Sequence, residues 1–229
     1  MSVLKLYHNP LSTNSRRVWI VLLEKEIEFE LVPLKLNGDQ FQPDFLAISF
    51  FHHVPVLADA DFHIIETLAI LDYLEAKYPA PALLPEDARD LAIARMVQMV
   101  AVNELSPAMS PLVRQTFGGA GDPEKLEKRR LQVAAVLRFF EGLLGDSLRD
   151  SFASRPFFGS SAMTLADVVA GVSVTWLPEL GVSLDDYPKL QAWSERLNSR
   201  LSWQQTQASP ELVEAFKVQM KQLMKPQQG

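Results

Sequence analysis

The sequence predicts an α/β domain followed by an all-helical domain, and three observations carry this prediction. Short runs that alternate polar and apolar residues, as strands do, lie in the first part of the chain. From about residue 86 onward, apolar residues recur at helical spacing instead. Between the two parts, the segment 79–85 (PAPALLP) contains three prolines in seven residues, which cannot continue a helix. We therefore expect domains at 1–79 and 86–229, joined by a linker at 80–85.

The first part predicts the order strand, helix, strand, helix, strand, strand, helix. The run 18–23 in its first helix is apolar all round and must be mostly buried. Residues 28–34 alternate as a half-buried strand does, and the turn 59–61 (DAD) joins the last two strands. The expected bounds are, in order, 3–8, 15–25, 28–34, 44–48, 55–58, 62–65 and 66–78.

The second part is predicted to be helical throughout. Asp122 followed by Pro123 is a capping residue with proline at the first helical position. Thr164 and Asp167 form a capping box in which Asp replaces the usual Glu. The clear helix candidates are 87–104, 123–144, 164–176 and 187–197.

Composition and charge exclude several classes of function. Acidic residues number 28 against 22 dispersed basic ones, a formal charge of −6, so nucleic acid is not an expected partner. The longest strictly apolar stretch is far shorter than the ~20 residues that span a bilayer, and no apolar signal segment follows Met1, so we expect a cytoplasmic protein without membrane contact. The sequence has no cysteine, which excludes disulfides and a nucleophilic thiol of its own. His52 and His53 are sequential neighbours, His63 lies across a turn, and there is no second carboxylate at ligand spacing, so no metal is expected.

A candidate anion site lies at residues 9–15 (NPLSTNS), between the first predicted strand and the first predicted helix. The N-terminal end of a helix carries partial positive charge and unpaired amides, and this loop adds hydroxyl and amide side chains. Arg16 and Arg17 follow directly and are expected to add full positive charge. The simpler interpretation is that Ser12 or Ser15 only caps the helix.

Two further features complete a groove. Pro55, at the entry to the third strand, keeps the backbone of Val54 out of the sheet's hydrogen bonds, so an extended peptide could pair there. Glu66 suits an amine, and Thr67 can cap the next helix, where its hydroxyl and the neighbouring amides suit a small carboxylate. Each feature alone also fits a strand-initiating proline or an ordinary cap. Together they indicate a site for a short acidic peptide.

Four motifs stand in a specific order: YHNPLS at 7–12, VPVL at 54–57, ETLAI at 66–70 and TLAD at 164–167. This order resembles the glutathione S-transferase family over nearly the whole chain, in particular its serine-type, theta- and zeta-like, bacterial-looking members. The resemblance implies a thioredoxin-like N-terminal domain, an all-helical C-terminal domain, a cis bond before Pro55 and a homodimer. It also implies glutathione as co-substrate, which is the imported thiol that a chain without cysteine needs.

Carried onto this sequence, the resemblance gives Ser12 the hydroxyl that hydrogen-bonds the sulfur of glutathione, with Ser15 and Tyr7 as alternates. A hydrogen bond to a charged group contributes ~1.5 to 3 kcal/mol, and a helix N-terminus ~0.3 to 1 kcal/mol. Since one pKa unit corresponds to about 1.36 kcal/mol, the two together can lower a thiol pKa from ~8.5 by about one to two units. We therefore expect a thiolate that attacks a small hydrophobic electrophile.

The resemblance also assigns the groups that bind the rest of glutathione. The backbone of Val54, followed by Pro55, would pair with the cysteinyl part. Glu66 and Thr67 would hold the γ-glutamyl end. His53 takes the position near the glycine carboxylate.

The run SFFHH at 49–53 departs from the family's usual Asn-Pro-x-Gly-Lys run, which leaves the contact at the glycine end open. Three further interpretations of the whole chain stay open. It could be a zeta-like isomerase of maleylacetoacetate type that regenerates glutathione, a peroxidase, or a transferase-like binding protein without catalysis.

Overall fold

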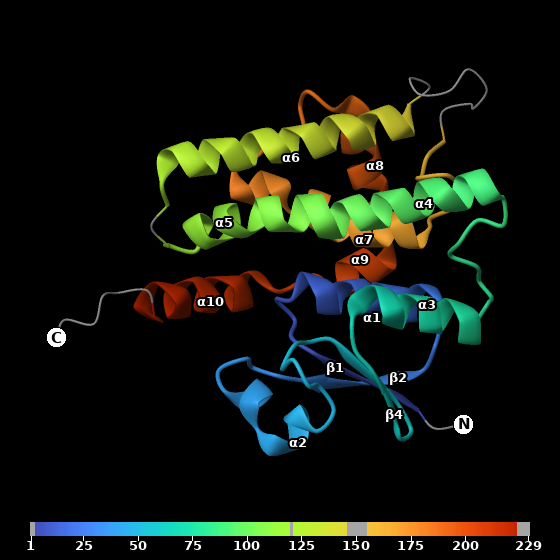
Figure 1. Cartoon of the computed structure of the whole chain (residues 1–229), viewed down its shortest axis with the longest axis vertical. Coiled ribbons are helices and arrows are strands. Elements are labelled where there is room, and N and C mark those ends of the chain that lie inside the picture. Colours follow the sequence, from blue (N-terminus) through green and yellow to red (C-terminus); the bar gives the residue numbers. More distant parts are fainter. Residues whose placement is uncertain (1–2, 120, 146–154, 224–229) are drawn as a thin grey trace. The chain divides into compact units, whose positions relative to one another are not determined.

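The computed structural model describes residues 3–119, 121–145 and 155–223, which fold into two compact units (Figure 1). The first unit comprises the residues up to Leu84 together with Arg200–Gln207, and the second comprises Pro85–Ser199 and the residues from Ala208 on. The segment 200–207 thus groups with the first unit, although the sequence pattern placed it in the helical part. The expected domain bounds, 1–79 and 86–229 with a linker at 80–85, stay a prediction.

A four-stranded sheet with the order β2-β1-β3-β4 forms the centre of the first unit. Its strands are β1 (Leu4–His8), β2 (Phe29–Pro33), β3 (Val56–Asp59) and β4 (Phe62–Ile64). β1 pairs in parallel with β2 and antiparallel with β3, and β3 pairs antiparallel with β4. Leu4 and Leu6 alternate with exposed or half-buried neighbours and are buried, as the alternation predicts. The predicted order of strands and helices is confirmed.

Helices lie on both faces of this sheet (Figure 1). α1 (Thr13–Glu24) and α3 (Thr67–Lys77) pack against each other on one face, and the short α2 (Pro43–Leu46) lies on the other. The apolar run of α1 is mostly buried, as predicted, because it faces both the sheet and α3. On the other face, Phe45 of α2 packs into a buried cluster with Leu34, Val54 and Val56.

Buried Lys25 ties the end of α1 to the segment that follows α3. Its Nζ donates to the backbone oxygens of Tyr78 (2.8 Å) and Pro81 (2.9 Å) and forms an ion pair with Glu75 at 2.6 Å. The carboxylate of Glu75 also accepts a hydrogen bond from the N–H of Leu83 at 2.9 Å. The proline-rich segment is therefore fixed to the first unit.

The second unit is helical in its described residues, apart from one isolated bridge between Phe157 and Ser160. Every residue of α7 is buried, so α7 is the core helix of this unit. The predicted capping box of Thr164 and Asp167 is confirmed at its start. No helix in the described ranges is both long and apolar enough to cross a membrane, and the cytoplasmic location stays a prediction. The helices are α4 (Ala88–Val100), α5 (Ser106–Thr116), α6 (Pro123–Leu144), α7 (Leu165–Val174), α8 (Pro188–Asn198) and α10 (Pro210–Leu223), with a 3-10 turn at Leu177–Leu180.

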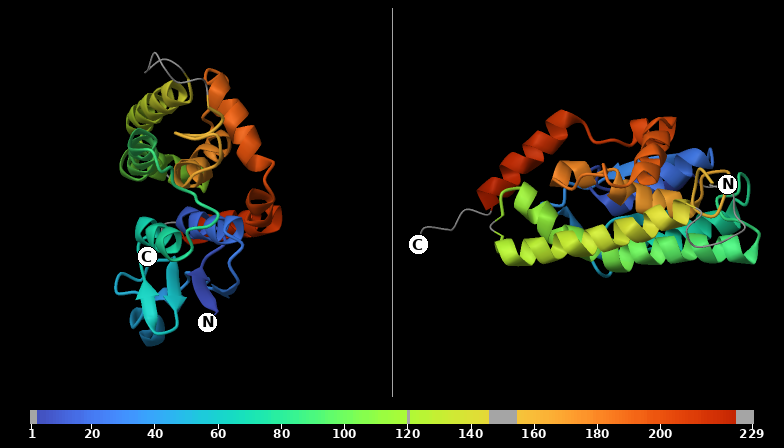
Figure 2. Two further views of the ribbon diagram at one scale, coloured as in Figure 1. Left: turned by 90° about the vertical axis from the view of Figure 1, so that its right-hand side faces the viewer. Right: turned by 90° about the horizontal axis from the view of Figure 1, so that it is seen from above.

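One long helical rod replaces the predicted helix 87–104. α4 continues through a π-helical turn (Ala101–Leu105) into α5, and the rod runs beside α6 (Figure 2). Pro107, in the first turn of α5, has no N–H to donate to the preceding turn, and the wider π turn accommodates it. The expected end at residue 104 is therefore wrong.

The sequence pattern does not predict α9 (Leu201–Gln205) or α10. Long-range contacts hold α9 against α1 within the first unit. The guanidinium of Arg200 donates two hydrogen bonds to the carboxylate of Glu24, at 2.8 and 2.6 Å, and the hydroxyl of Ser202 donates to the same carboxylate. These partners lie 176 or more residues apart, so no local pattern reveals them.

Candidate functional site

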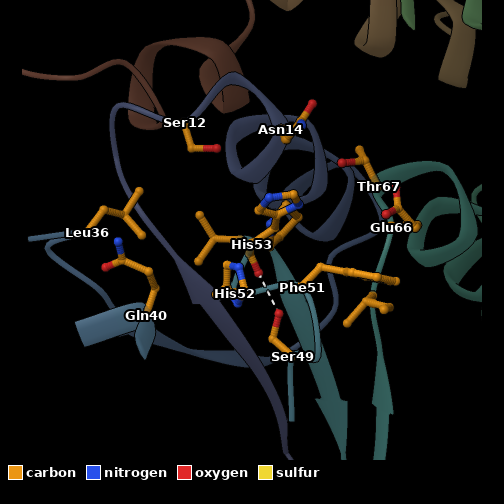
Figure 3. Close-up of a pocket in the computed structure, with 13 residues that line it drawn as sticks. Ser12, Asn14, Leu36, Gln40, Ser49, Phe51, His52, His53, Glu66 and Thr67 are labelled. Atoms are coloured by element: carbon orange, nitrogen blue, oxygen red, sulfur yellow. Dashed lines mark hydrogen bonds between the residues drawn. The ribbon is translucent and has the colours of Figure 1, made fainter. Parts of the chain in front are cut away.

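A cavity of about 400 Å³ in the first unit contains most of the site residues expected from the sequence (Figure 3). Ser12, His53, Val54, Pro55, Glu66 and Thr67 all line it, whereas Ser15 and Tyr7 do not. Its other lining residues are Asn14, Leu36, Gln40, Ser49, Phe51, His52 and Ile65. The loop before α1, the segment before β3 and the start of α3 thus meet around one pocket.

Ser12 is the N-cap of α1, with extended backbone angles of φ −80° and ψ 117°. Its Oγ accepts a hydrogen bond from the N–H of Ser15 at 3.2 Å, and its own N–H donates to the oxygen of Asn9 at 3.0 Å. Because the oxygen serves as the acceptor in the cap, the hydroxyl proton can be donated to a ligand in the pocket. The capping and the functional interpretation of Ser12 are therefore compatible.

Asn9 holds the loop that carries Ser12. Its Oδ1 accepts from the N–H of Leu11 at 2.9 Å, and its Nδ2 donates to the oxygen of Leu34 at 2.7 Å, just beyond β2. This is the local turn that an Asn before a proline favours. Asn9 is not among the site residues expected from the sequence, although the Asn-Pro pair is a visible turn signal.

The two alternates for the thiol contact lie elsewhere. Ser15 is 1% exposed, and its Oγ accepts a hydrogen bond from the N–H of Asn9 at 3.3 Å. Tyr7 packs against the cluster around Phe45, with ring centroids 6.2 Å apart. Neither residue lines the pocket.

Arg16 and Arg17 follow the loop directly, but neither side chain lines the pocket. The guanidinium of Arg16 donates to Oγ1 of Thr206 at 3.2 Å and to the oxygen of Trp203 at 3.1 Å. Arg17 is buried and donates to Oδ1 of Asn14 at 2.7 Å, and burial lowers its pKa to about 10. Arg17 therefore contacts a lining residue, since Asn14 lines the pocket, whereas the partners of Arg16 do not.

The Val54–Pro55 bond is cis, as the resemblance implies. β3 begins only at Val56, so the backbone of Val54 lies outside the sheet ladder at the edge of the pocket. The hydroxyl of Ser49 donates to the oxygen of His53 at 2.9 Å and fixes the segment that precedes this bond. The backbone of Val54 is thus available to an extended peptide.

Glu66 and Thr67 stand at the N-terminus of α3. Glu66 is the N-cap with φ 69° and ψ 119°, and its side chain makes no cap hydrogen bond. Thr67 is the first helical residue, so the expectation that it caps the helix is wrong. The first-turn amides of α3 are therefore available to an anion. A non-glycine residue at positive φ stores strain, and such strain clusters at ligand sites.

The wall on the other side of the pocket is built from residues 36–53. Figure 3 shows Leu36 and Gln40 on the side away from Glu66 and Thr67. Oε1 of Gln40 accepts from the N–H of Gly38 at 3.1 Å, which leaves the Nε2 group as a donor. Leu36 and Gln40 are not among the site residues expected from the sequence, because the irregular loop that carries them has no periodic pattern. Among the described residues, no group of three or more His, Cys, Asp or Glu could hold a metal.

Comparison with known proteins gives the same family in both parts of the chain. Residues 6–82 match the family "Glutathione S-transferase, N-terminal domain", and residues 100–200 match "Glutathione S-transferase, C-terminal domain". The curated protein "Glutathione S-transferase 3" of Zea mays is 34% identical over 221 residues, which cover 91% of this chain and 95% of that protein.

Solved structures of glutathione transferases are also similar to this chain. "Glutathione S-transferase III in apo form" has a TM-score of 0.74 and 35% identity, covering 90% of this chain and 95% of its own. A transferase homologue from Sulfitobacter, solved with bound glutathione, has a TM-score of 0.72 and 27% identity, covering 90% of this chain and 97% of its own. The predicted fold, a thioredoxin-like N-terminal domain with a helical C-terminal domain, is confirmed. The theta- or zeta-like, bacterial-looking subclass is not confirmed, since curated relatives such as the one from Zea mays are plant proteins.

Proposed function

The chain belongs to the glutathione S-transferase family and is a glutathione transferase, and from this premise we propose that Ser12 and the N-terminus of α1 hold the sulfur of glutathione as a thiolate. The observation that carries the proposal is the hydrogen-bonding state of Ser12. Its oxygen is engaged by the N–H of Ser15, its proton is free to be donated, and it lines the pocket. Neither alternate lines the pocket.

The energetics support a modest pKa shift of the bound thiol. A hydrogen bond from the Ser12 hydroxyl to a thiolate contributes ~1.5 to 3 kcal/mol, and the α1 N-terminus adds ~0.3 to 1 kcal/mol. α1 has no acidic residue in its first turn to oppose this effect. At about 1.36 kcal/mol per pKa unit, a thiol of ordinary pKa ~8.5 becomes largely ionised near neutral pH.

The same pocket offers partners for the peptide ends. The backbone of Val54 would pair with the cysteinyl residue, and the first-turn amides of α3 with Thr67 would hold the γ-glutamyl carboxylate. The carboxylate of Glu66 would hold the γ-glutamyl amine, since a charge-assisted hydrogen bond suits an ammonium group. These contacts orient the sulfur, so that binding energy is converted into positioning for the reaction.

The proposed reaction is conjugation to a small apolar electrophile. The thiol proton leaves to solvent, the thiolate forms a carbon–sulfur bond at the electrophilic carbon, and the leaving group departs with its electron pair. Aromatic side chains gather in the second unit, where the ring of Phe117 lies 6.2 Å from Trp176 and 5.2 Å from Phe216. Such a cluster supports an apolar second substrate.

We also propose a homodimer, as the family resemblance implies. The outer face of α4 exposes Met96 by 43% and Met99 by 49%, one helical turn apart, and Asn103 continues the same face. Adjacent exposed methionines are typical of an association surface. Sedimentation velocity should give twice the chain mass. The double variant Met96→Lys/Met99→Lys should give a monomer, whereas Leu201→Lys, at a singly exposed leucine of α9, should not.

Incubation with two different substrates, together with calorimetry, tests the proposed activity against its alternatives. With an aryl halide such as chlorodinitrobenzene, glutathione should be consumed in proportion to the halide released. An isomerase would convert a cis-dienoic acid and leave the glutathione concentration unchanged. A binding protein without catalysis would give calorimetric heat with glutathione and neither reaction. Absence of heat at millimolar glutathione would contradict the proposal altogether.

A further inference from the structure

α9 is bonded to α1 next to the turn that carries Ser12 (Figure 1). The N–H of Arg16 donates to the backbone oxygen of Ser12 at 3.0 Å, so the two residues share the first turn of α1. The guanidinium of Arg16 donates to Oγ1 of Thr206 at 3.2 Å and to the backbone oxygen of Trp203 at 3.1 Å. Arg16 therefore connects the turn of Ser12 to a segment 187 to 190 residues further along the chain.

The partners of Arg16 on the α9 side are fixed in place. Thr206 and Trp203 are each 1% exposed. The hydroxyl of Thr206 donates to the backbone oxygen of Ser202 at 2.8 Å, while its oxygen accepts from Arg16. Buried groups whose other hydrogen bonds are already made have little freedom to rearrange. The end of α9 thus offers the side chain of Arg16 a rigid anchor.

A second contact joins the same two helices at the other end of α1. The carboxylate of Glu24, the last residue of α1, accepts hydrogen bonds from Arg200 at 2.8 and 2.6 Å and one from the hydroxyl of Ser202. From the rise per residue of an α-helix, Glu24 lies about 18 Å along the helix from Ser12. Both contacts stabilise the packing of α9 on α1, but only the contact of Arg16 lies at the turn that carries the Ser12 hydroxyl.

We propose that Arg16 is a positioning residue for the bound thiol and that α9 acts on the reaction through it, an inference that rests on the proposed function. Arg16 does not line the pocket, so it acts through Ser12 and not on the sulfur itself. Its contact with α9 holds the first turn of α1 where the Ser12 hydroxyl meets the thiolate. Because a displacement of about 1 Å can slow a reaction by about 100-fold, a small shift of this turn is enough to weaken that hydrogen bond.

The pKa of glutathione bound to the full-length protein, titrated through the ultraviolet absorbance of the thiolate, tests the proposal. Arg16→Met keeps an unbranched side chain and removes the bonds to α9, so the thiol pKa should rise by about 0.5 to 1 unit. Arg16→Lys can bond to only one of the two partners and should give a smaller rise. If Arg16→Met lowers stability and leaves the thiol pKa unchanged, Arg16 is a structural residue and the proposal is overturned.

Glu24→Gln is the matched control, because it weakens the other contact between α1 and α9. It should lower the free energy of unfolding, as Arg16→Met does, and leave the pKa of the bound thiol unchanged. Equal rises of the thiol pKa in the two variants would mean that the contact at Arg16 has no role of its own, which also overturns the proposal.

The Ser12→Ala variant separates positioning from a direct effect of charge. Added to Ser12→Ala, Arg16→Met should cause no further rise of the thiol pKa, since the hydroxyl that Arg16 positions is gone. A further rise would mean that the guanidinium acts on the sulfur directly, against the proposal. If Ser12→Ala raises the pKa and Arg16→Met alone does not, the proposed function stands and this inference fails. If Ser12→Ala has no effect, the proposed role of Ser12 fails and the inference fails with it.

Two substitutions of Thr206 test the contact with Arg16 and its charge left intact. Thr206→Val removes the oxygen that accepts from Arg16, whereas Thr206→Ser keeps it. The valine variant should raise the pKa of the bound thiol, by less than Arg16→Met because the bond to Trp203 remains, and the serine variant should not. This pair decides if Arg16→Met does not fold, and equal thiol pKa values in the two Thr206 variants would overturn the proposal.

Discussion

The N–H of Ser15 donates a hydrogen bond of 3.2 Å to Oγ of Ser12, while Oγ of Ser15 accepts one of 3.3 Å from the N–H of Asn9. The two serines, one helical turn apart, therefore differ in their hydrogen bonds and in their exposure. Ser15 is 1% exposed and lies inside the turn, whereas Ser12 faces the pocket with its proton to donate. This arrangement favours Ser12 over Ser15 in the proposed contact with the thiol.

Ser12→Ala should raise the pKa of enzyme-bound glutathione by about one to two units while its affinity changes little, since the lost hydrogen bond acts mainly on the ionised sulfur. The ultraviolet absorbance of the thiolate, titrated against pH in the bound complex, measures this directly. Removal of the cap should also lower the free energy of unfolding by about 1 kcal/mol.

Ser12→Thr is the matched control, because it keeps both the capping oxygen and a donating hydroxyl. It should restore most of the low thiol pKa. A titration that Ser12→Ala leaves unchanged would transfer the role to Ser15 or Tyr7.

Asn9→Ala should change the pKa of the bound thiol indirectly, through the loop that carries Ser12. It removes the hydrogen bonds to Leu11 and Leu34, so the loop that places Ser12 loosens. We expect a loss of about 1 to 3 kcal/mol in the free energy of unfolding and a partial rise in the bound thiol's pKa. Asn9→Asp keeps the acceptor for Leu11 but sets a carboxylate oxygen against the oxygen of Leu34, so it should change both at least as much as Asn9→Ala. A drop in stability without any change in the thiol pKa would make Asn9 a structural residue only.

Local patterns were sufficient to predict most of the fold. The Asp122–Pro123 signal gives the start of α6, and the pattern of polar and apolar residues gives the four strands, because caps and side-chain periodicity are encoded within a few residues. α9 depends on the contact of Arg200 with Glu24, which lies 176 residues away, and no local pattern contains it.

The candidate site likewise contains residues that local patterns predict and residues that they do not. Ser12, Val54 and Glu66 are visible because each begins or precedes a regular element. Gln40 lies in a loop whose path depends on Gly38 at φ 131° and on packing, so its place in the pocket could not be predicted. The orientation of Arg16 toward α9 is likewise a tertiary property.

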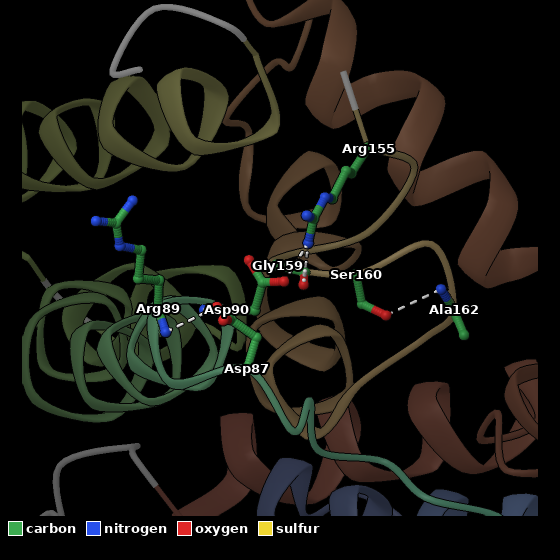
Figure 4. A network of polar contacts seen from close by, with 7 residues as sticks. All are labelled: Asp87, Arg89, Asp90, Arg155, Gly159, Ser160 and Ala162. Atoms are coloured by element: carbon green, nitrogen blue, oxygen red, sulfur yellow. Dashed lines mark hydrogen bonds and ion pairs between the residues drawn. The ribbon is translucent and has the colours of Figure 1, made fainter. Parts of the chain in front are cut away.

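Gly159→Ala should destabilise the second unit strongly. Gly159 has φ +70°, and a Cβ there would lie 2.8 Å from the backbone oxygen of Asp90. The guanidinium of Arg155 holds this close approach, since it donates to both Asp90 and the oxygen of Gly159 at 2.6 Å (Figure 4). We expect a loss of about 3 kcal/mol in the free energy of unfolding, measured by urea denaturation.

Gly181→Ala separates the cost of the left-handed backbone from the cost of the contact with Asp90, because Gly181 has φ +74° and nothing within 4 Å of a built Cβ. It should cost only the left-handed backbone penalty of about 1 to 2 kcal/mol. Equal losses at the two glycines would mean that the contact with Asp90 contributes nothing.

Asp167 is the buried polar centre of the second unit. Its carboxylate accepts hydrogen bonds from the N–H of Phe158 (3.0 Å), the N–H and hydroxyl of Thr164 (both 2.7 Å) and Nε1 of Trp193 (2.8 Å). Burial raises its pKa from 3.8 to about 6, and these hydrogen bonds oppose the rise without cancelling it. Asp167→Asn should cost about 3 kcal/mol or more, because an amide presents a donor to groups that are themselves donors.

The raised pKa of Asp167 also fixes the sign of a pH dependence. Between about pH 4 and pH 6 the folded state binds a proton at this carboxyl that the unfolded state has released, so the contribution of Asp167 to stability falls as pH rises through this window. A shift of about two units corresponds to a change of about 3 kcal/mol at most. Asp167→Asn removes this titration, so the stability difference between the unmodified chain and the variant should be larger at pH 4 than at pH 7. Asp185→Asn, at an exposed carboxylate, is the control and should show no such trend. If the stability difference between the unmodified chain and Asp167→Asn instead grows with pH, the hydrogen bonds outweigh burial and hold the pKa of Asp167 below its ordinary value.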